Sequence, residues 1–465
     1  MEKHAARVRV FWFAAAALAA CVVFLVWHYR PENAIRVGTA SISQTLCDEV
    51  FVSGLEPSRV FTEDILPQRG IHILLRRIRY TVNVQRKQVV TTWAGHFAGV
   101  ATYYPGYGCM LGDEKPSAPF VAPNFSSASG DAAAAENSAT PISPSNPMLS
   151  EALDRAFAEP PRPPYRRVRA IVVMRDGKII AERYAQGIGP DTPLLSYSVS
   201  KSVINALIGI LVGQGKLNLY TPAPVAAWSS PGDPRHAITL DELLRMTSGL
   251  NLEESDSGFD PVSKMMFLKR DMAAYAEKAM LIAKPGETWE YTSGNTLIAS
   301  AILRDAVGGS AADVLRFAHR ELFDPVGMRH VIMEFDGAGT PIGSTRILAS
   351  ARDWARFGDL YLNDGVVDSK RILPEGWVSY STKPTLDSPY GSGFWVNAGQ
   401  SDDARGRVQA GMPADAFFAS GNFGQRIVIL PSQKLVIVRF GVTIDPPDFD
   451  IRGLIRLVKD VIAAR

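Results

Sequence analysis

The sequence has few of the residues that disulfide-rich, metal-binding or nucleic-acid-binding proteins need. Its three cysteines are too few for a disulfide scaffold and too scattered for a four-ligand zinc site, and its seven histidines form no H-E-x-x-H motif. The 49 Lys and Arg residues nearly balance the 47 Asp and Glu residues, and no run of five basic residues occurs. We therefore expect no metal site and no nucleic-acid partner.

Several cofactor and catalytic motifs are also absent. The chain has no G-x-S-x-G elbow and no G-x-x-x-x-G-K-[ST] phosphate loop. Its glycines Gly106, Gly108 and Gly112 miss the dinucleotide-binding spacing by one residue. We therefore expect no cofactor. The length of 465 residues allows two or three domains with a sizeable core.

One long uncharged run is present near the N-terminus. Residues Val10 to Trp27 form 18 positions without a charge, and a helix of that length nearly crosses a hydrocarbon core of about 30 Å. Lys3, Arg7 and Arg9 precede the run, which favours a cytoplasmic N-terminus. Residues 1–30 are therefore predicted to be a single-pass anchor in a bacterial inner membrane, with the rest of the chain periplasmic or extracellular.

Two other interpretations of this segment stay open. It can be a cleaved signal peptide, or Leu18–Cys21 can be a lipoprotein site at which Cys21 is acylated after cleavage. Val22 to Trp27 stays apolar after the cysteine, whereas a processed site normally opens into polar sequence. This difference favours the uncleaved anchor.

Residues 37–112 are predicted to form a small β-containing region. Ile78, Tyr80 and Val82 alternate with polar residues, as in a half-buried strand, and Gly99–Tyr104 is short and rich in β-formers. Cys47 and Cys109 stand at the edges of this region on the predicted non-cytosolic side, so we expect a disulfide between them, worth about 4 kcal/mol on the loop-entropy estimate. The alternative is two buried free thiols.

Residues 113–165 are predicted to be a linker or arm. The segment is rich in Pro, Ala and Ser, and the stretch 126–139 has too little apolar surface to fold alone. A helix is expected at Asn146–Phe157, where the next domain begins to form.

Residues 166–465 show the pattern of one larger domain. Asp176-Gly177 between two apolar runs predicts a β-hairpin, and a second hairpin is expected around Pro431. Helices are expected between these hairpins, among them Ser202–Val212, which is apolar nearly all round. This order predicts an α/β fold of the α+β kind, with an antiparallel sheet built from both ends of the domain and a helical insertion.

Ser198-Val199-Ser200-Lys201 is the most chemically specific motif of this domain. Side chains at i and i+3 share one face of a helix, so the Ser198 hydroxyl and the Lys201 amine can meet. A serine needs a base at neutral pH, and apolar surroundings lower a lysine's pKa toward that role. The motif alone is weak evidence for catalysis. A serine that caps the helix and a lysine that extends its amine to solvent would have the same sequence.

Three further segments occur in a suggestive order. They are Leu243–Leu250, Trp289–Ser293 after Pro285-Gly286, and Ala419–Gln425. With the first motif they resemble the serine β-lactamase and penicillin-binding-protein superfamily. The chain looks most like its class C-related serine hydrolases, a branch with esterases, D-aminopeptidases and 6-aminohexanoate-dimer hydrolases. The resemblance runs from about Ala156 to the C-terminus.

The resemblance implies specific roles for residues of these motifs. Ser198 matches the acylated nucleophile, Lys201 its partner, and Tyr291 the tyrosine that shuttles protons to the leaving group. A tyrosine of ordinary pKa does this only beside a lysine ammonium, so Lys201 and Tyr291 are interpreted as one coupled unit. Ser293 stands where many members have asparagine, and is a candidate substrate-binding residue.

The third motif departs from the family pattern. Ala419-Ser420-Gly421 lacks the usual cation, although Ser420 and Gly421 still match substrate-binding positions. The backbone N–H groups of Ser198 and Asn422 are expected to form an oxyanion hole, which needs no particular side chain. Arg426 is expected on the same strand, about 16 Å past Gly421 at about 3.3 Å per residue and out of reach.

These observations predict a serine hydrolase that cleaves small esters or amides through an acyl-enzyme on Ser198. The missing cation favours substrates without an essential carboxylate over penicillins and cephalosporins. The alternative is a penicillin-binding or sensor-like protein that is acylated but turns over slowly. A dead hydrolase fold is disfavoured because Ser198, Lys201 and Tyr291 occur together.

Overall fold

The structure is a computed structural model that describes residues 12, 30–68, 76–116, 140–444 and 447–464. The predicted anchor Val10–Trp27, with Cys21, lies outside the described residues except for Trp12, and so does the Ala/Ser-rich stretch 126–139. Among the helices within the described ranges, none has both the length and the apolar character needed to span a bilayer.

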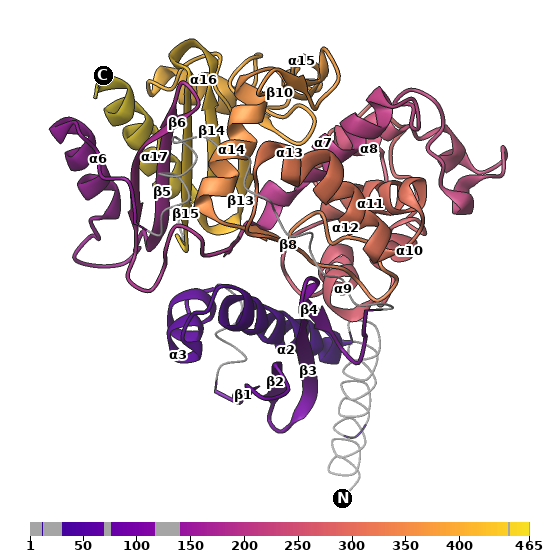
Figure 1. Ribbon diagram of the computed structural model, residues 1–465. Helices are drawn as coiled ribbons and strands as arrows, with labels where there is room; N and C mark the ends of the chain where they lie inside the picture. The colour runs from indigo at the N-terminus through magenta and orange to yellow at the C-terminus, as the bar shows by residue number, and fades with distance from the viewer. Residues whose placement is uncertain (1–11, 13–29, 69–75, 117–139, 445–446, 465) are drawn as a thin grey trace, which may run out of the picture.

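The N-terminal region packs one long helix against a small antiparallel sheet (Figure 1). Helix α2, Pro31–Cys47, continues into a π-helical turn at Asp48–Val52, and the short helix α3, Pro57–Val60, continues into a second at Phe61–Ile65. The sheet has the strand order β1-β2-β3-β4, with bounds Ile78–Asn83, Gln88–Trp93, His96–Tyr104 and Gly108–Leu111. The expected strands are present, whereas α2 was not predicted.

A glycine allows α2 to lie close to this sheet. A Cβ added to Gly99 on β3 would stand 2.4 Å from the backbone of Thr39 on α2. The Ser43 hydroxyl of the same helix donates to the Gly99 carbonyl at 2.9 Å. The backbones of helix and sheet therefore come into close contact here, and only glycine fits at position 99.

The main domain is built around a six-stranded antiparallel sheet of order β12-β13-β14-β15-β5-β6. The strand bounds, in that order, are Trp395–Val396, Phe417–Gly421, Gln425–Leu430, Leu435–Gly441, Val168–Arg175 and Lys178–Tyr184. Strands β5 and β6 come from the start of the domain and the other four from its end. The predicted fold class is confirmed, and both predicted hairpins are present.

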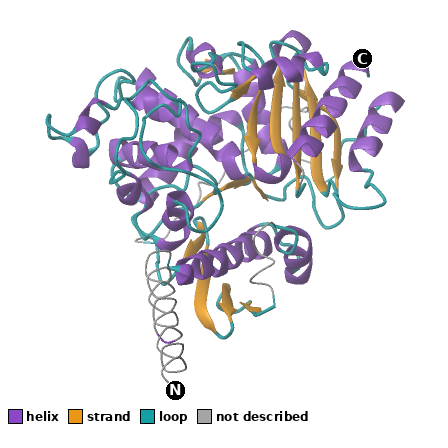
Figure 2. Ribbon diagram, turned by 180° about the vertical axis from the view of Figure 1, so that it is seen from behind, coloured by secondary structure: helices purple, strands orange, loops and turns teal. Residues whose placement is uncertain are grey.

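Helices cover both faces of this sheet (Figure 2). Helices α6, Pro147–Phe157, and α17, Pro447–Ala463, lie on one face, and α14, Ala351–Leu362, lies on the other (Figure 1). Leu149 and Leu153 of α6 belong to the same hydrophobic cluster as Leu454 of α17. Helix α6 is therefore part of the main domain, which begins before the expected boundary at 166.

The insertion between β6 and β12 is mostly helical. Its helices are α7 (Ser200–Gly213), α8 (Leu240–Leu244), α9 (Pro261–Leu268), α10 (Met272–Ala276), α11 (Ser293–Val307), α12 (Ala311–Ala318), α13 (Asp324–Val326), α14 and α15 (Trp377–Thr382). Helix α16, Asp402–Gln409, follows β12. Two small sheets complete the insertion: β7-β9-β8 at Leu194–Leu195, Ile347–Ala349 and Val331–Met333, and the hairpin β10-β11 at Val366–Val367 and Lys370–Arg371. Helix α7 lies between the large sheet and helices α8, α11 and α12 (Figure 1).

Candidate active site

Ser198 lies in a tight 3-10 turn, Tyr197–Val199, that leads from β7 into α7. Tyr197 has φ of 49°, a left-handed conformation that costs a tyrosine free energy. Its ring packs edge-on against Phe423, at 5.0 Å between ring centroids, and Phe423 is also left-handed with φ of 60°. Two strained residues therefore pack against each other: Tyr197, directly before Ser198, and Phe423, directly after Asn422.

The predicted base reaches the predicted nucleophile. The Lys201 Nζ atom lies 3.1 Å from the Ser198 Oγ atom, and Lys201 is 3% exposed. The same ammonium donates to the Ser344 carbonyl at 3.2 Å, from the loop before β9. Ser198 is only half-buried, so a substrate can approach the hydroxyl while the amine stays shielded from water.

Behind Lys201 runs a short chain of hydrogen bonds. Lys201 Nζ donates to the Ser293 Oγ atom at 3.2 Å, and the Ser293 hydroxyl donates to Glu254 at 2.9 Å. The Ser293 backbone N–H also donates to Glu254. Ser293 is fully buried, so the structure places it behind the lysine and not at an open substrate position as its motif suggested.

Burial sets the protonation of the site. It lowers the pKa of Lys201 to about 8, although the nearby carboxylates of Glu254 and Asp256 act in the opposite direction. Burial raises the pKa of Tyr291 above its usual value of 10.0, and a hydrogen bond with Ser198 offsets part of that shift. Tyr291 is therefore a protonated phenol at neutral pH, beside a lysine that is still mostly an ammonium at pH 7 and half neutral near pH 8.

This differs from the predicted ammonium–phenolate unit. The Lys201 Nζ atom lies over the face of the Tyr291 ring, 4.7 Å from its centroid. In an apolar site both charged forms lose hydration, which lowers the pKa of Lys201, raises that of Tyr291 and disfavours a phenolate.

The expected oxyanion hole lies where β13 meets the nucleophile turn. A Cβ added to Gly421 would stand 2.2 Å from the Ser196 carbonyl oxygen and 3.2 Å from the Ser198 nitrogen. Only glycine lets β13 come this close to the serine, which brings the exposed Asn422 next to the half-buried Ser198. Ser420 precedes Gly421 on the same strand and is also half-buried.

The expected position of Arg426 is wrong. The chain reverses after Asn422, so Arg426 lies on β14 directly opposite Ser420 and not farther along the same strand. Its guanidinium donates to the carbonyls of Gly421 and Gln425, both at 2.8 Å, and its charge acts on Tyr291. A cation is therefore near the third motif, although it is 8% exposed and bound to backbone carbonyls.

Aromatic rings surround Tyr291. Its ring centroid lies 5.5 Å from that of Tyr390, 5.5 Å from that of Trp395 and 6.5 Å from that of Trp289. Trp289 and Trp395 are only half-buried. They give one side of the site an apolar wall suited to an apolar acyl or leaving group.

Sequence reasoning missed Glu254 and Ser344. Glu254 belongs to the acidic stretch Glu253–Asp256, which lies between the Ser198 motif and the Tyr291 motif. The acidic residues are visible in the sequence, but they follow no helical or strand periodicity that would indicate where they point. Ser344 contributes only its carbonyl, so no residue type could have indicated it. Both reach Lys201 from loops distant in sequence.

Among the described residues, one group of possible metal ligands lies together: Asp48, Cys109 and Glu334. The Cys109 sulfur is already bonded to Cys47 in a disulfide with a Cα–Cα distance of 6.1 Å. Without a thiolate, two buried carboxylates remain, and these pair with other protein groups.

The main domain is similar to known proteins. The beta-lactamase family profile matches residues 154–458, about two thirds of the chain. The chain belongs to the beta-lactamase family. It is 24% identical over 298 residues to 6-aminohexanoate-dimer hydrolase of Paenarthrobacter ureafaciens, covering 61% of this chain and 75% of that protein.

Solved structures show the same fold at low identity. A putative 6-aminohexanoate-dimer hydrolase from Bacillus anthracis superposes with a TM-score of 0.54 at 22% identity, over 68% of this chain and 81% of that one. A family VIII carboxylesterase gives a TM-score of 0.54 at 13% identity, over 70% of this chain and all of that one. These solved structures show the fold of the main domain.

Proposed function

We propose that the chain hydrolyses small esters or amides through an acyl-enzyme on Ser198. The observation that carries the proposal is the 3.1 Å contact between Ser198 Oγ and a buried Lys201 whose pKa is near 8. At neutral to slightly alkaline pH a useful fraction of this lysine is a free base, which a serine nucleophile requires.

Acylation then proceeds by attack of the Ser198 oxygen on the substrate carbonyl. Lys201 takes the serine proton, and the Ser198 and Asn422 N–H groups stabilise the charge that develops on the carbonyl oxygen. Tyr291, held protonated by burial, donates a proton to the departing alcohol or amine, and regains one from Lys201. Water hydrolyses the ester on Ser198, which releases the acid and restores the hydroxyl.

The substrate class follows from the walls of the site. Trp289 and Trp395 offer apolar contacts, and the Arg426 guanidinium is bound to backbone carbonyls. We therefore favour short-chain esters or small amides without an essential carboxylate. The relatives named as 6-aminohexanoate-dimer hydrolases and as a carboxylesterase are consistent with both bond types.

The proposed location is the periplasmic or extracellular side of a bacterial inner membrane, with residues 1–30 as anchor. Support comes from the uncharged run Val10–Trp27 and the cationic residues before it. The disulfide between Cys47 and Cys109 also suits an oxidising compartment.

One experiment tests the chemistry. Intact mass after treatment with a fluorophosphonate should show a single adduct in the wild type and none in Ser198→Ala. An adduct of equal yield in Ser198→Ala would disprove the proposal. Turnover of p-nitrophenyl butyrate beyond one equivalent then separates a hydrolase from a slow, receptor-like protein.

A second comparison tests the substrate class. The kcat/KM values for p-nitrophenyl butyrate, a 6-aminohexanoate dimer and nitrocefin are measured on one preparation. Nitrocefin should be the poorest substrate. If it exceeds the ester by about tenfold, a cation does bind the carboxylate, and Arg426→Met shows whether Arg426 is that cation.

A further inference from the structure

The backbone segment before and at the start of β9 supports the nucleophile from behind. The Ser344 carbonyl accepts from Lys201 at 3.2 Å. The Ile347 carbonyl accepts from the Ser196 hydroxyl at 2.5 Å, and the Ile347 N–H donates to Ser200 Oγ at 3.0 Å. This segment, residues 344–347, therefore holds the residues on both sides of Ser198 as well as the base.

Arg346 lies within this segment and connects it to the N-terminal region. Its guanidinium forms an ion pair with Asp48, which directly follows α2, and both side chains are almost fully buried, at 5% and 0% exposure. Arg346 is also bound to Glu334, the residue after β8, whose N–H donates to the Arg346 carbonyl at 3.0 Å. The position of residues 344–347 thus depends on the N-terminal region.

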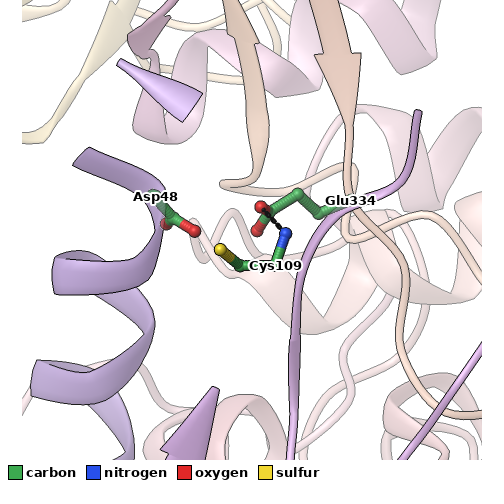
Figure 3. Close-up of side chains that lie close together, drawn as sticks. All are labelled: Asp48, Cys109 and Glu334. Carbon is green, nitrogen blue, oxygen red and sulfur yellow. Dashed lines mark hydrogen bonds between the residues drawn. The ribbon is translucent and has the colours of Figure 1, made fainter. Parts of the chain in front are cut away.

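Glu334 is held by the same region. Its carboxylate accepts from the Cys109 N–H at 2.5 Å and from the Gln44 amide at 3.2 Å. Figure 3 shows Asp48, Cys109 and Glu334 converging from three different segments of the chain. The disulfide fixes the two N-terminal members of this cluster, because Cys47 precedes Asp48.

A second buried ion-pair cluster also joins the N-terminal region to the main domain. Arg169 of β5 binds Glu49 at 3.1 Å and Asp64 at 2.6 Å, all three almost fully buried. Burial raises the pKa of Tyr197, and the charges of Arg346 and Asp64 both act on its hydroxyl. Acids of the N-terminal region and their arginine partners therefore act electrostatically on the residue that precedes Ser198.

We propose that residues 31–111 are a positioning unit for the hydrolase site, acting through the Asp48–Arg346 pair on residues 344–347. The inference rests on the proposed function. Removing one partner of a buried ion pair leaves an uncompensated charge and is costly, so the pair constrains where its two partners lie. Asp48 and Arg346 are positioning residues, since they reach Ser198 and Lys201 only through the backbone of this segment.

The experiment uses the whole chain with Asp48→Asn and Arg346→Lys. The matched control is Glu182→Gln, which breaks another buried arginine–carboxylate pair, Glu182 with Arg352 at 2.8 Å, on β6 and α14. For each protein, kcat and KM for p-nitrophenyl butyrate, the fluorophosphonate labelling rate and Tm are measured. Rates are normalised to the folded fraction from near-ultraviolet circular dichroism.

Both positioning variants should lose about ten- to a hundredfold in kcat and in labelling rate with KM nearly unchanged. Glu182→Gln should lower Tm but keep its rate per folded molecule. Equal rates per folded molecule in wild type, Asp48→Asn and Arg346→Lys would overturn the inference. A wild type that neither labels nor turns over would instead remove the proposed function.

A milder variant covers the case in which Asp48→Asn does not fold. Gln44→Met removes one donor to Glu334 and leaves every charge in place. It should lower kcat by a smaller factor, severalfold, at unchanged KM. An unchanged kcat in this variant would count against the inference.

Discussion

The chemistry of the site depends on the proton that Lys201 can accept. Its pKa of about 8, against a usual 10.5, means that the fraction of free base rises steeply between pH 7 and 9. We predict that kcat/KM and the labelling rate rise with pH to a plateau, with a midpoint near 8. Rates measured from pH 6 to 10 check this, and a flat profile from 7 to 9 would assign the base elsewhere.

Removal of the reacting groups should have large effects. Ser198→Ala and Lys201→Ala are each expected to lower hydrolysis of p-nitrophenyl butyrate by several orders of magnitude, and Tyr291→Phe to remove most activity by deleting the proton donor. Ser432→Ala is the control, because this exposed serine lies at the far end of β14 from the site. Near-normal turnover in Ser198→Ala contradicts the mechanism.

Glu254 should influence both the rate and its pH dependence. Its carboxylate accepts two hydrogen bonds from Ser293 and raises the pKa of Lys201 against the effect of burial. In Glu254→Gln the charge is lost and an amide can accept only one of these bonds. We predict a kcat about tenfold lower and a pH midpoint shifted below that of the wild type.

The control for this prediction is Glu253→Gln, since the neighbouring Glu253 is exposed. A midpoint that moves upward in Glu254→Gln, or that moves equally in both variants, is the contrary result. Either would mean that Glu254 does not act on Lys201 through Ser293.

Sequence could predict the site residues that share a local motif. Ser198 and Lys201 lie three residues apart at a helix start, and the 3.1 Å contact follows from that spacing. Glu254 could not be predicted in this way, because its contact with Ser293 joins a loop to a helix N-terminus 39 residues away. Arg426 was misplaced because the reversal at Phe423 depends on a left-handed tyrosine–phenylalanine pair that no residue pattern indicates.

At the scale of elements, strands and buried helices could be predicted better than helices with a polar buried face. The Asp176-Gly177 turn and the apolar helix α7 carry strong local signals. Helix α2 carries a weak one, since Thr39, Ser43 and Gln44 are among its fully buried residues. The Ser43 hydroxyl and the Gln44 amide are satisfied by the small sheet and by Glu334, partners that are not visible in the helix itself.

The contact between β13 and the nucleophile turn can be tested by one methyl group. Gly421→Ala places a Cβ 2.2 Å from the Ser196 carbonyl oxygen, so β13 must move away from Ser198 and widen the oxyanion hole. We predict that kcat falls by about a hundredfold or more while the protein stays folded. Turnover measures the first effect and circular dichroism checks the second. Gly406→Ala on α16 is the control, because nothing lies within 4 Å of its added Cβ.

Full activity in Gly421→Ala would show that the close approach is not needed for catalysis. An equal loss in Gly406→Ala would show that the effect is not local to the site. The expected result would show that catalysis requires the backbone position of β13. The family resemblance did not decide whether this strand acts through its backbone or through its side chains.

At the scale of the molecule, the N-terminal region and the main domain share one core. Leu46 and Val60 belong to the same hydrophobic cluster as Val199, the residue directly after the nucleophile. The family match covers 154–458 and leaves residues 31–111 outside it. Sequence predicted two separate folded regions, and could not predict that their shared interface lies behind Ser198, because the ion pairs there join residues up to 298 positions apart.

The disulfide is the covalent link within this interface, and its removal should affect both stability and activity. Cys47 and Cys109 are fully buried and 62 residues apart, so the bridge restricts the unfolded chain by about 4 kcal/mol. We predict that the Cys47→Ser/Cys109→Ser double variant unfolds at lower urea concentration by about that free energy. It should also lose part of its kcat, since Asp48 and the Cys109 N–H are no longer fixed at Arg346 and Glu334. Cys21→Ser is the control and should leave stability and kcat unchanged.

Peptide mapping without reduction should find Cys47 and Cys109 linked in protein purified from its native membrane. Two free thiols there would contradict the bridge and the proposed location together, because an oxidising compartment would have joined cysteines held this close.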